Sequence, residues 1–327
     1  MRRRELLQFA GTASIAWPLV ARAQDASKHP RIGFLGNSTP ALEAKLVESF
    51  REGLRDLGYV EGRNIAIDYR WAEGNYERLP SLVAEFIALK VEVIVTAGTP
   101  ASLAVKRASS SVPLVMVAVG DPIGTGLVAG LARPGGNATG LTSIAPELEG
   151  KRLELIKEVI PAVSRLAVFW NPANAVMIAD EQQVQAAAAA LHVPVLSLPV
   201  RTAEELDDAF AKILAEGADA VLVLADRVFL HNRQRIADFV VEHRLPAMNA
   251  YRELVEAGAL MSFGPSYAVM HRQAATYVVK ILKGAKPADL PVQQPAKFEF
   301  VVNLKSAGAI GIKIPHTVLL RADEVIE

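Results

Sequence analysis

The chain has 327 residues, of which 51% are hydrophobic and 21% are charged, and this apolar fraction excludes an intrinsically disordered chain. Lysine plus arginine and aspartate plus glutamate number 35 each, so no basic surplus points to nucleic acid as a partner. Cysteine is absent, which excludes disulfides, thiolate metal sites, iron–sulfur clusters, cysteine nucleophiles and a lipid anchor on an N-terminal cysteine.

The first 23 residues have the pattern of an export signal (1–23). Arginines at positions 2–4 precede an apolar stretch at 6–20, and Ala21-Arg22-Ala23 supplies the small residues that signal peptidase accepts. Polar residues, glycine and proline interrupt the apolar stretch, which is shorter than the ~20 residues that span a bilayer. We therefore expect cleavage after Ala23 and a periplasmic mature chain with no membrane span. The Arg3-Arg4 pair resembles the twin-arginine motif, and the general secretory route is the alternative.

The first half of the chain alternates apolar runs with stretches of helical spacing. Residues 31–36 form an apolar run, and in 41–58 leucine and phenylalanine recur three or four positions apart, on one helical face. This alternation predicts a parallel sheet covered by helices on both faces. The expected elements are strand 31–36, helix 41–58, strand 64–69, helix 76–90, strand 91–96, a helix to 109 and strand 113–118.

The second half repeats this order of elements without repeating the sequence. The repeat predicts two similar α/β lobes, each a doubly wound parallel sheet. The expected elements are strand 165–170, helix 177–191, strand 193–198, helix 203–216, strand 219–224, a helix to 243 and strand 245–249.

The last part of the chain departs from the repeat. A strand at 259–263 and a long helix at 267–283 precede a proline-rich extended stretch, and a strand at 298–303 follows. A late helix and a late strand separated by extended chain allow the polypeptide to cross between the lobes more than once. The expected lobes are 28–143 plus 265–293 for the first, and 144–264 plus 294–327 for the second.

Several short stretches together resemble a known family. They are WPLVARAQ at 17–24, LGYVEGRN at 57–64, VTAGTP at 95–100, LARPGGNATG at 131–140, MSFGPSY at 261–267 and ILKG at 281–284. In this order they resemble the ABC-transporter substrate-binding family, in the group that includes tryptophan-binding-like members, over essentially the whole chain. The resemblance implies a type I periplasmic binding fold with a three-crossing hinge. It also implies a small-molecule ligand and an ABC permease in the inner membrane as partners.

Motifs of several enzyme classes are absent or out of context. The glycine-rich run at 124–130 follows Asp121-Pro122 instead of joining a strand to a helix, so a turn explains it better than a dinucleotide-binding loop. The six histidines are scattered without a close pair of metal ligands, and no G-x-S-x-G elbow occurs. We therefore expect no metal and no cofactor.

Polar and aromatic residues follow the carboxyl ends of the predicted strands, where open α/β sheets bind their ligands. Any one of them could instead cap a helix or a turn, but a cleft between lobes would bring the whole set together. The candidates are Asn37, Ser38, Gly98, Thr99 and Asp121 in the first lobe, Thr142 and Ser143 at the first crossing, Asn171, Asp226, Asn249 and Tyr251 in the second lobe, and Phe263 and Tyr267 around the second crossing.

These patterns predict a monomeric solute-binding protein that closes around an amino-acid-like zwitterion without making or breaking a bond. Asp121 or Asp226 would pair with the ammonium group, and aromatic residues such as Tyr251 and Tyr267 would supply apolar walls. Two alternatives stay open. One is an exported enzyme that uses Asp121 or Asp226 as a general acid or base, and the other is a sensor that signals to a membrane receptor. An export signal in place of a DNA-binding module argues against nucleic acid.

Overall fold

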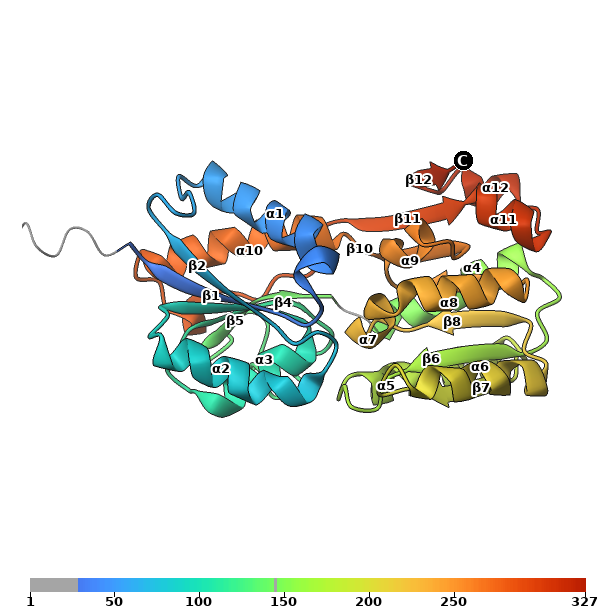
Figure 1. The fold of residues 1–327 in the computed structure, drawn as a ribbon, viewed down its shortest axis with the longest axis horizontal. Helices are drawn as coiled ribbons and strands as arrows, with labels where there is room; N and C mark the ends of the chain where they lie inside the picture. The colour runs from blue at the N-terminus through green and yellow to red at the C-terminus, as the bar shows by residue number, and fades with distance from the viewer. Residues whose placement is uncertain (1–28, 144–145) are drawn as a thin grey trace, which may run out of the picture.

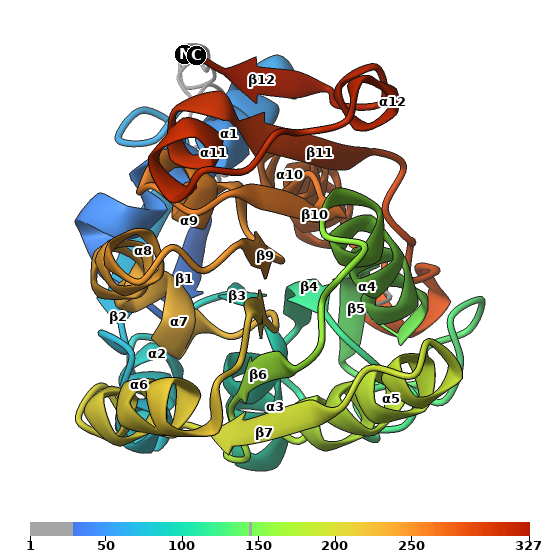
Figure 2. The same cartoon turned by 90° about the vertical axis from the view of Figure 1, so that its right-hand side faces the viewer.

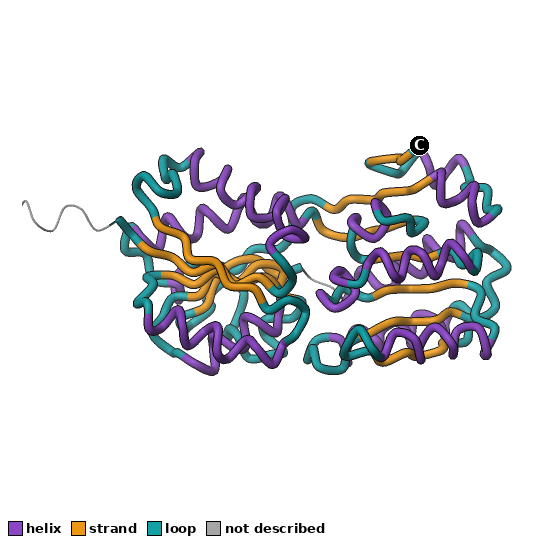
Figure 3. Tube along the Cα trace, in the orientation of Figure 1, coloured by secondary structure: helices purple, strands orange, loops and turns teal. Residues whose placement is uncertain are grey.

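The computed structural model describes residues 29–143 and 146–327. The expected export signal at 1–23 lies outside the described residues. The described chain forms two lobes that lie side by side, each built on one β-sheet with helices on both faces (Figures 1 and 3).

The sheet of the first lobe has five parallel strands within residues 29–143. They are β1 (Arg31–Gly36), β2 (Ala66–Trp71), β3 (Val93–Ala97), β4 (Leu114–Val119) and β5 (Ala138–Thr142), in the order β2-β1-β3-β4-β5. Every residue of β3 is buried. Helices cover the sheet on both sides, which explains why its central strands read as continuous apolar runs.

Helices from distant parts of the chain cover this sheet (Figure 1). On one face lie α2 (Leu79–Ala88), which follows the short 3-10 helix η1 (Tyr76–Arg78), and α3 (Thr99–Ala108). On the other face α1 (Pro40–Asp56) lies beside the late helix α10 (Tyr267–Leu282). The chain therefore returns to the first lobe after it has built most of the second.

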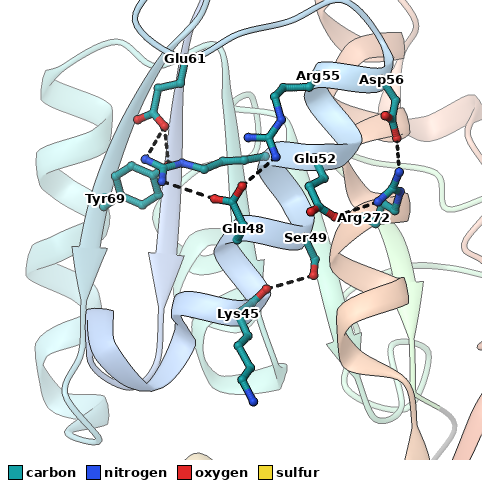
Figure 4. Close-up of polar contacts among 10 residues, drawn as sticks. Lys45, Glu48, Ser49, Glu52, Arg55, Asp56, Glu61, Tyr69 and Arg272 are labelled. Atoms are coloured by element: carbon teal, nitrogen blue, oxygen red, sulfur yellow. Dashed lines mark hydrogen bonds and ion pairs between the residues drawn. The ribbon is translucent and has the colours of Figure 1, made fainter.

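Helix α10 is held closely against α1. A Cβ atom on Gly53 would collide with the carbonyl oxygen of Arg272, so only glycine permits this approach of the two helices. The Arg272 guanidinium donates hydrogen bonds to Glu52 at 2.8 Å and Asp56 at 2.6 Å (Figure 4). These contacts make α10 an integral part of the first lobe.

The second lobe is built on seven strands within residues 146–327. They are β6 (Leu166–Trp170), β7 (Val195–Pro199), β8 (Ala220–Val223), β9 (Ala247–Asn249), β10 (Met261–Pro265), β11 (Phe298–Asn303) and β12 (Glu324–Ile326), in the order β12-β11-β10-β9-β8-β6-β7. β10 and β11 pair antiparallel, and the other neighbours pair parallel.

Helices also cover both faces of this second sheet (Figure 2). One face carries α4 (Pro146–Val159), α5 (Met177–Ala190) and α12 (His316–Leu319). The other face carries α6 (Glu205–Glu216), α8 (Arg233–Glu242), α9 (Arg252–Glu256) and α11 (Leu304–Ile310), and the short α7 (Arg227–His231) leads into α8.

Aromatic side chains fill the core between strands and helices. The rings of Phe34 in β1 and Phe50 in α1 lie 5.7 Å apart, and those of Phe169 in β6 and Phe210 in α6 lie 6.0 Å apart. Burying each such side chain contributes about 1.5–3 kcal/mol to folding. The packed sheets give the residues that follow each strand a fixed position.

The chain passes between the lobes at three places, after Ser143, at Ser266 and before Lys297, and in the described residues these crossings are joined by hydrogen bonds. The Thr142 amide donates to the Gln293 carbonyl at 2.9 Å, and the Ser266 amide donates to the Lys297 carbonyl at 3.0 Å. Adjacent short segments of this kind are where two lobes can rotate without unpacking their cores.

The predicted fold class is confirmed, because the structure has two α/β lobes whose sheets are predominantly parallel. Three predicted details were incomplete. The helix expected up to residue 243 is divided into α7 and α8 at Asn232. The last part of the second sheet contains the antiparallel pair β10–β11. The elements β5, α4, α9, α11, α12 and β12 were not predicted.

Strand β5 shows why some elements escaped prediction. Its sequence, Ala138-Thr-Gly-Leu-Thr142, has no apolar run, and Gly140 adopts a φ of 131°. A Cβ atom there would collide with the backbone of Met116 in β4. Strand β5 therefore depends on the close approach of its backbone to that of β4, and hydrophobic periodicity does not detect such an approach.

Candidate ligand-binding site

A pocket lies between the lobes, where the carboxyl ends of both sheets meet. The residues that line it are Asn37, Tyr76, Gly98, Thr99, Pro100, Ala118, Gly120 and Ser143 from the first lobe, Asn174, Val176, Met177, Asp180, Ala225, Arg227 and Tyr251 from the second lobe, and Tyr267 at the start of α10.

The first lobe presents the N-terminus of α3 to the pocket. Gly98 has a φ of 82° and caps the ten-residue helix without a side-chain hydrogen bond to its first turn. The helix dipole favours negative charge at this end. Beside it, Asn37 donates a hydrogen bond to the Ala97 carbonyl, and the Oδ1 atom of Asn37 is buried without a partner among the described residues.

Strand β4 bends where it reaches the pocket. Its pairing with β5 shifts register between Met116 and Val119, and Ala118 between them has a φ of 57°, which is unusual for a residue with a side chain. The Thr142 hydroxyl donates to the Val119 carbonyl at 2.7 Å and so supports the bend from β5. Irregular strand ends of this type often aim backbone groups at a ligand.

The second lobe presents a buried arginine to the pocket. Arg227, at the start of α7, is 4% exposed, and its guanidinium carbon lies 5.2 Å from the ring centre of Tyr251 and 5.6 Å from that of Tyr267. Among the described residues its side chain makes no hydrogen bond and no ion pair. Cation–π contacts and the more distant carboxyl groups of Glu43 and Glu253 offset part of the cost of burying this charge. Because no group of the described chain accepts a hydrogen bond from the guanidinium, its N–H groups are available to an anion.

A buried carboxyl group lies in the same pocket. Asp180, in the first turn of α5, is fully buried, and neither of its carboxyl oxygens has a hydrogen-bond partner in the part of the chain that the structure describes. Burial raises the pKa of Asp180 to about 8; the negative charge of Glu149 and, more weakly, Asp121 add to the rise, and Arg152 opposes it.

Asp226 is already surrounded by donors. Its carboxylate accepts hydrogen bonds from Asn171 Nδ2 at 3.0 Å, Asn174 Nδ2 at 2.9 Å and the Val228 amide at 3.0 Å. The Tyr76 hydroxyl of the first lobe donates to the same carboxylate at 2.9 Å. Burial raises the pKa of Asp226, and these hydrogen bonds favour its charged form. Asp226 therefore joins the two lobes instead of offering a free carboxylate.

The structure brings six of the predicted site residues to the pocket lining within the described chain: Asn37, Gly98, Thr99, Ser143, Tyr251 and Tyr267. Asn171 and Asp226 lie behind the lining in the network just described. Ser38 is buried behind it as well, with its amide bonded to Glu43, and Thr142 supports the bend of β4.

Three other predicted residues lie away from the lining. Asp121 is exposed and accepts hydrogen bonds from the amides of its own loop, at Ile123 and Gly124. The Asn249 side chain donates to the Met261 carbonyl at 3.1 Å inside the second sheet. Phe263 stacks on Phe298 at the hinge, with ring centres 6.1 Å apart.

Sequence analysis missed lining residues that do not follow a strand directly. Tyr76 starts a 3-10 helix, and Asp180 stands inside an alanine-rich helix that has little amphipathic pattern. Helical spacing could have placed Asp180 on the same face as Val176 and Met177, but nothing in the sequence shows that this face turns toward the other lobe.

In residues 29–143 and 146–327, no group of three or more histidine, aspartate or glutamate side chains is arranged to hold a metal ion. No helix in the same residues is both long enough and apolar enough to cross a membrane.

The family model of the ABC transporter substrate binding protein matches residues 37–326, nearly the whole described chain. The chain belongs to this family. Its fold is that of the type I periplasmic binding proteins, and the pocket occupies the inter-lobe position where open α/β sheets bind ligands.

Similar proteins and solved structures cover most of this ABC transporter substrate-binding protein. The tyrosine-binding protein of Clostridioides difficile (strain R20291) is 26% identical over 274 residues, which are 84% of this chain and 78% of that protein. The crystal structure of a conserved domain protein from Vibrio cholerae is 32% identical, with a TM-score of 0.84 over 91% of this chain and 100% of that one. An ABC domain from Streptococcus pneumonia in complex with L-Trp is 27% identical, with the same TM-score and coverage.

Proposed function

We propose that this protein is the periplasmic solute-binding component of an ABC importer and that it captures an amino acid between its lobes. The observation that carries the proposal is the buried guanidinium of Arg227, which lines the pocket and forms no hydrogen bond or close ion pair in the described chain, with the acidic side chains of Glu43 and Glu253 acting on it only at longer range. A ligand carboxylate would supply that partner. The tyrosine-binding relative and the relative solved with L-Trp support an amino acid of aromatic type.

The pocket walls fit such a ligand. Tyr251 and Tyr267 flank Arg227, with ring centres 5.0 Å apart, and Tyr76 faces them from the first lobe. Aromatic rings bury an apolar or aromatic side group and pack against it edge to face or offset. The N-terminus of α3 favours the same negative charge from the opposite lobe.

Hinged closure follows from the position of the pocket. A ligand that contacts both lobes stabilises the closed form over the open form. We assign residues 28–143 plus 265–293 to one moving body and residues 144–264 plus 294–327 to the other. A permease in the inner membrane would recognise the closed shape, and a monomer suffices because one chain supplies both walls.

Export is a further part of this proposal. The signal pattern at 1–23 supports delivery to the periplasm with cleavage after Ala23, by the twin-arginine or the general route. Mass spectrometry of the protein from the periplasm is expected to find a mature chain that starts at Gln24.

Membership of this family supports ligand binding without a chemical reaction. The alternative of an exported enzyme took Asp121 or Asp226 as the general acid or base, and both of these side chains are engaged elsewhere. Asp226 is held by several donors, and Asp121 caps its own loop. Co-purification with a permease would distinguish an importer component from a sensor.

The test of ligand class is a thermal-shift screen against the common amino acids, followed by calorimetry. A cognate ligand at 100 times its Kd is expected to add about 2.7 kcal/mol of stability. Aromatic amino acids are expected to give the largest shifts. If no amino acid raises the melting temperature, the proposed ligand class is wrong.

A further inference from the structure

We propose that Asp180 is the receptor for the ammonium group of the ligand, opposite in charge to Arg227. This inference rests on the proposed function, because it requires an amine-bearing ligand in the inter-lobe pocket. Among the described residues that line the pocket, Asp180 is the only acid and Arg227 is the only base. One acid and one base in an otherwise neutral lining form the complement of a zwitterion.

The geometry leaves the Asp180 carboxyl group free for a ligand. The side chain is fully buried, and both of its oxygens have no hydrogen-bond partner within residues 29–143 and 146–327. Buried polar groups are nearly always paired, so a carboxyl group that is unpaired on both oxygens and lines a pocket is explained by a partner that arrives with the ligand.

Nearby charges do not satisfy Asp180. Arg152 is the nearest cationic influence, but its guanidinium donates to the Glu149 carboxylate and to the Phe263 carbonyl at 2.7 Å. Glu149 and the more distant Asp121 are both acidic and disfavour a negative charge on Asp180. No cation of the described chain lies within ion-pair distance of the carboxyl group.

These surroundings predict a proton exchange on binding. The pKa of Asp180 is raised to about 8 by burial first and by Glu149 second, so the free protein holds a proton on this group at pH 7. An arriving ammonium favours the carboxylate. The proton then leaves to solvent, and the ion pair of carboxylate and ammonium remains in the pocket.

The experiment combines a change in the protein with a matching change in the ligand. Calorimetry measures the affinity of wild type and Asp180→Asn for L-tryptophan and L-tyrosine, and for indole-3-propionate and 3-(4-hydroxyphenyl)propionate, which lack the amine. Wild type is expected to prefer the better amino acid over its amine-free analogue by at least about 30-fold. Asp180→Asn is expected to lose most of that preference.

A second readout counts protons. Titrations at pH 7 in buffers of different ionisation enthalpy are expected to show release of close to one proton by wild type and none by Asp180→Asn. Asp208→Asn is the matched acid-to-amide change on the exposed surface of α6, outside the lining, and it is expected to keep both the ligand preference and the proton release. The melting temperature of each free variant verifies that it is folded.

The outcomes separate this inference from the proposed function. If wild type binds an amino acid but Asp180→Asn keeps the preference for the amine, or if wild type releases no proton, the assignment of Asp180 is wrong and the binding function stands. If the amine-free analogue binds wild type as tightly as the amino acid does, Asp180 is again excluded. If wild type binds neither amino acid, the proposed ligand class fails and the inference fails with it.

Discussion

Arg227 and Asp180 are charged or titratable side chains that the folded chain buries without satisfying. Burying a guanidinium that forms no close ion pair costs several kcal/mol, and a buried carboxyl group without a hydrogen-bond partner adds to the loss of stability even when it is protonated. A ligand with a carboxylate and an ammonium group would recover that loss. Site residues of this kind are expected to cost stability in the free protein and to contribute most of the binding energy.

Replacement of Arg227 tests the anionic end of the ligand. Arg227→Gln is expected to lower the affinity for the best amino acid of the screen by at least about 30-fold, because the ligand carboxylate loses its buried partner. Arg252→Gln changes a half-exposed arginine that pairs with Glu256 and Glu324 outside this pocket, and it is expected to alter the affinity little. Calorimetry measures the affinity of both variants. If Arg227→Gln loses only a few-fold in affinity, Arg227 does not bind the ligand carboxylate.

The pH dependence of stability tests Asp180 without any ligand. An aspartate in the unfolded chain has a pKa of ~3.9, whereas burial raises the pKa of Asp180 in the folded chain to about 8. Between these values the native state keeps a proton that the unfolded state has lost, so this group lowers the free energy of unfolding as the pH rises from ~4 to ~8.

Asp180→Asn removes that dependence. The variant is expected to be more stable than wild type by about 5 kcal/mol at pH 8, with the difference shrinking toward zero near pH 4. Urea unfolding of both proteins across this range measures the difference directly, since other titrating groups such as His271 are common to both. Equal stability at pH 8 would show that the carboxyl group is not buried without a partner.

At the scale of elements, the contact of α1 with α10 joins the start of the first lobe to a helix that the chain makes after most of the second lobe. Because this contact depends on a glycine, the pair is sensitive to one methyl group. The three crossings of the hinge are also linked to each other by backbone hydrogen bonds. A weakened α1–α10 contact would therefore loosen the first lobe and the hinge together.

Two glycine-to-alanine substitutions, with opposite expected effects on stability, test this packing. Gly53→Ala is expected to destabilise the protein by about 1–3 kcal/mol, because the added methyl group meets the backbone of Arg272 in α10. Gly150→Ala, in α4, adds a methyl group with no atom within 4 Å and is expected to stabilise by about 0.4–1 kcal/mol. Thermal unfolding of both variants measures these two changes in stability. Destabilisation by both substitutions would contradict the prediction that, of these two glycines, only Gly53 is required by close packing.

The sequence predicted the elements whose signal is local. Strands such as 31–36 and 298–303 were placed correctly because buried strands are short, largely apolar runs, and the ends of strands led to Asn37, Thr99 and Tyr251 at the pocket. Asp180 and Tyr76 reach the pocket only because one lobe folds over the other. Contacts between residues 150 positions apart, such as that of Tyr76 with Asp226, leave no periodic trace in a single sequence.

At the scale of the whole molecule, the two lobes touch across the pocket. The Tyr76 hydroxyl of the first lobe donates to Asp226 of the second at 2.9 Å, and Lys45 lies 3.3 Å from Glu256 near the hinge. The contact of Tyr76 is shielded from water, whereas that of Lys45 is exposed and contributes little. Tyr76 therefore favours the closed arrangement over the open one.

Removal of the Tyr76 hydroxyl is expected to shift the ligand-free protein toward an open form. Tyr76→Phe leaves the ring in the pocket but takes one donor from Asp226, so ligand affinity is expected to fall by about 5- to 100-fold. Tyr277→Phe is the matched control, because its hydroxyl donates to the Pro291 carbonyl at 2.7 Å inside the first lobe. Scattering and calorimetry are expected to change for the first variant only.

Small-angle X-ray scattering with and without the best amino acid of the screen tests the central claim, that a ligand held by both lobes closes them. The wild-type radius of gyration is expected to decrease when the amino acid saturates the pocket, and the radius of Tyr76→Phe is expected to decrease further, from a more open start. A radius that stays the same in both proteins while calorimetry shows saturated binding would contradict closure between the lobes.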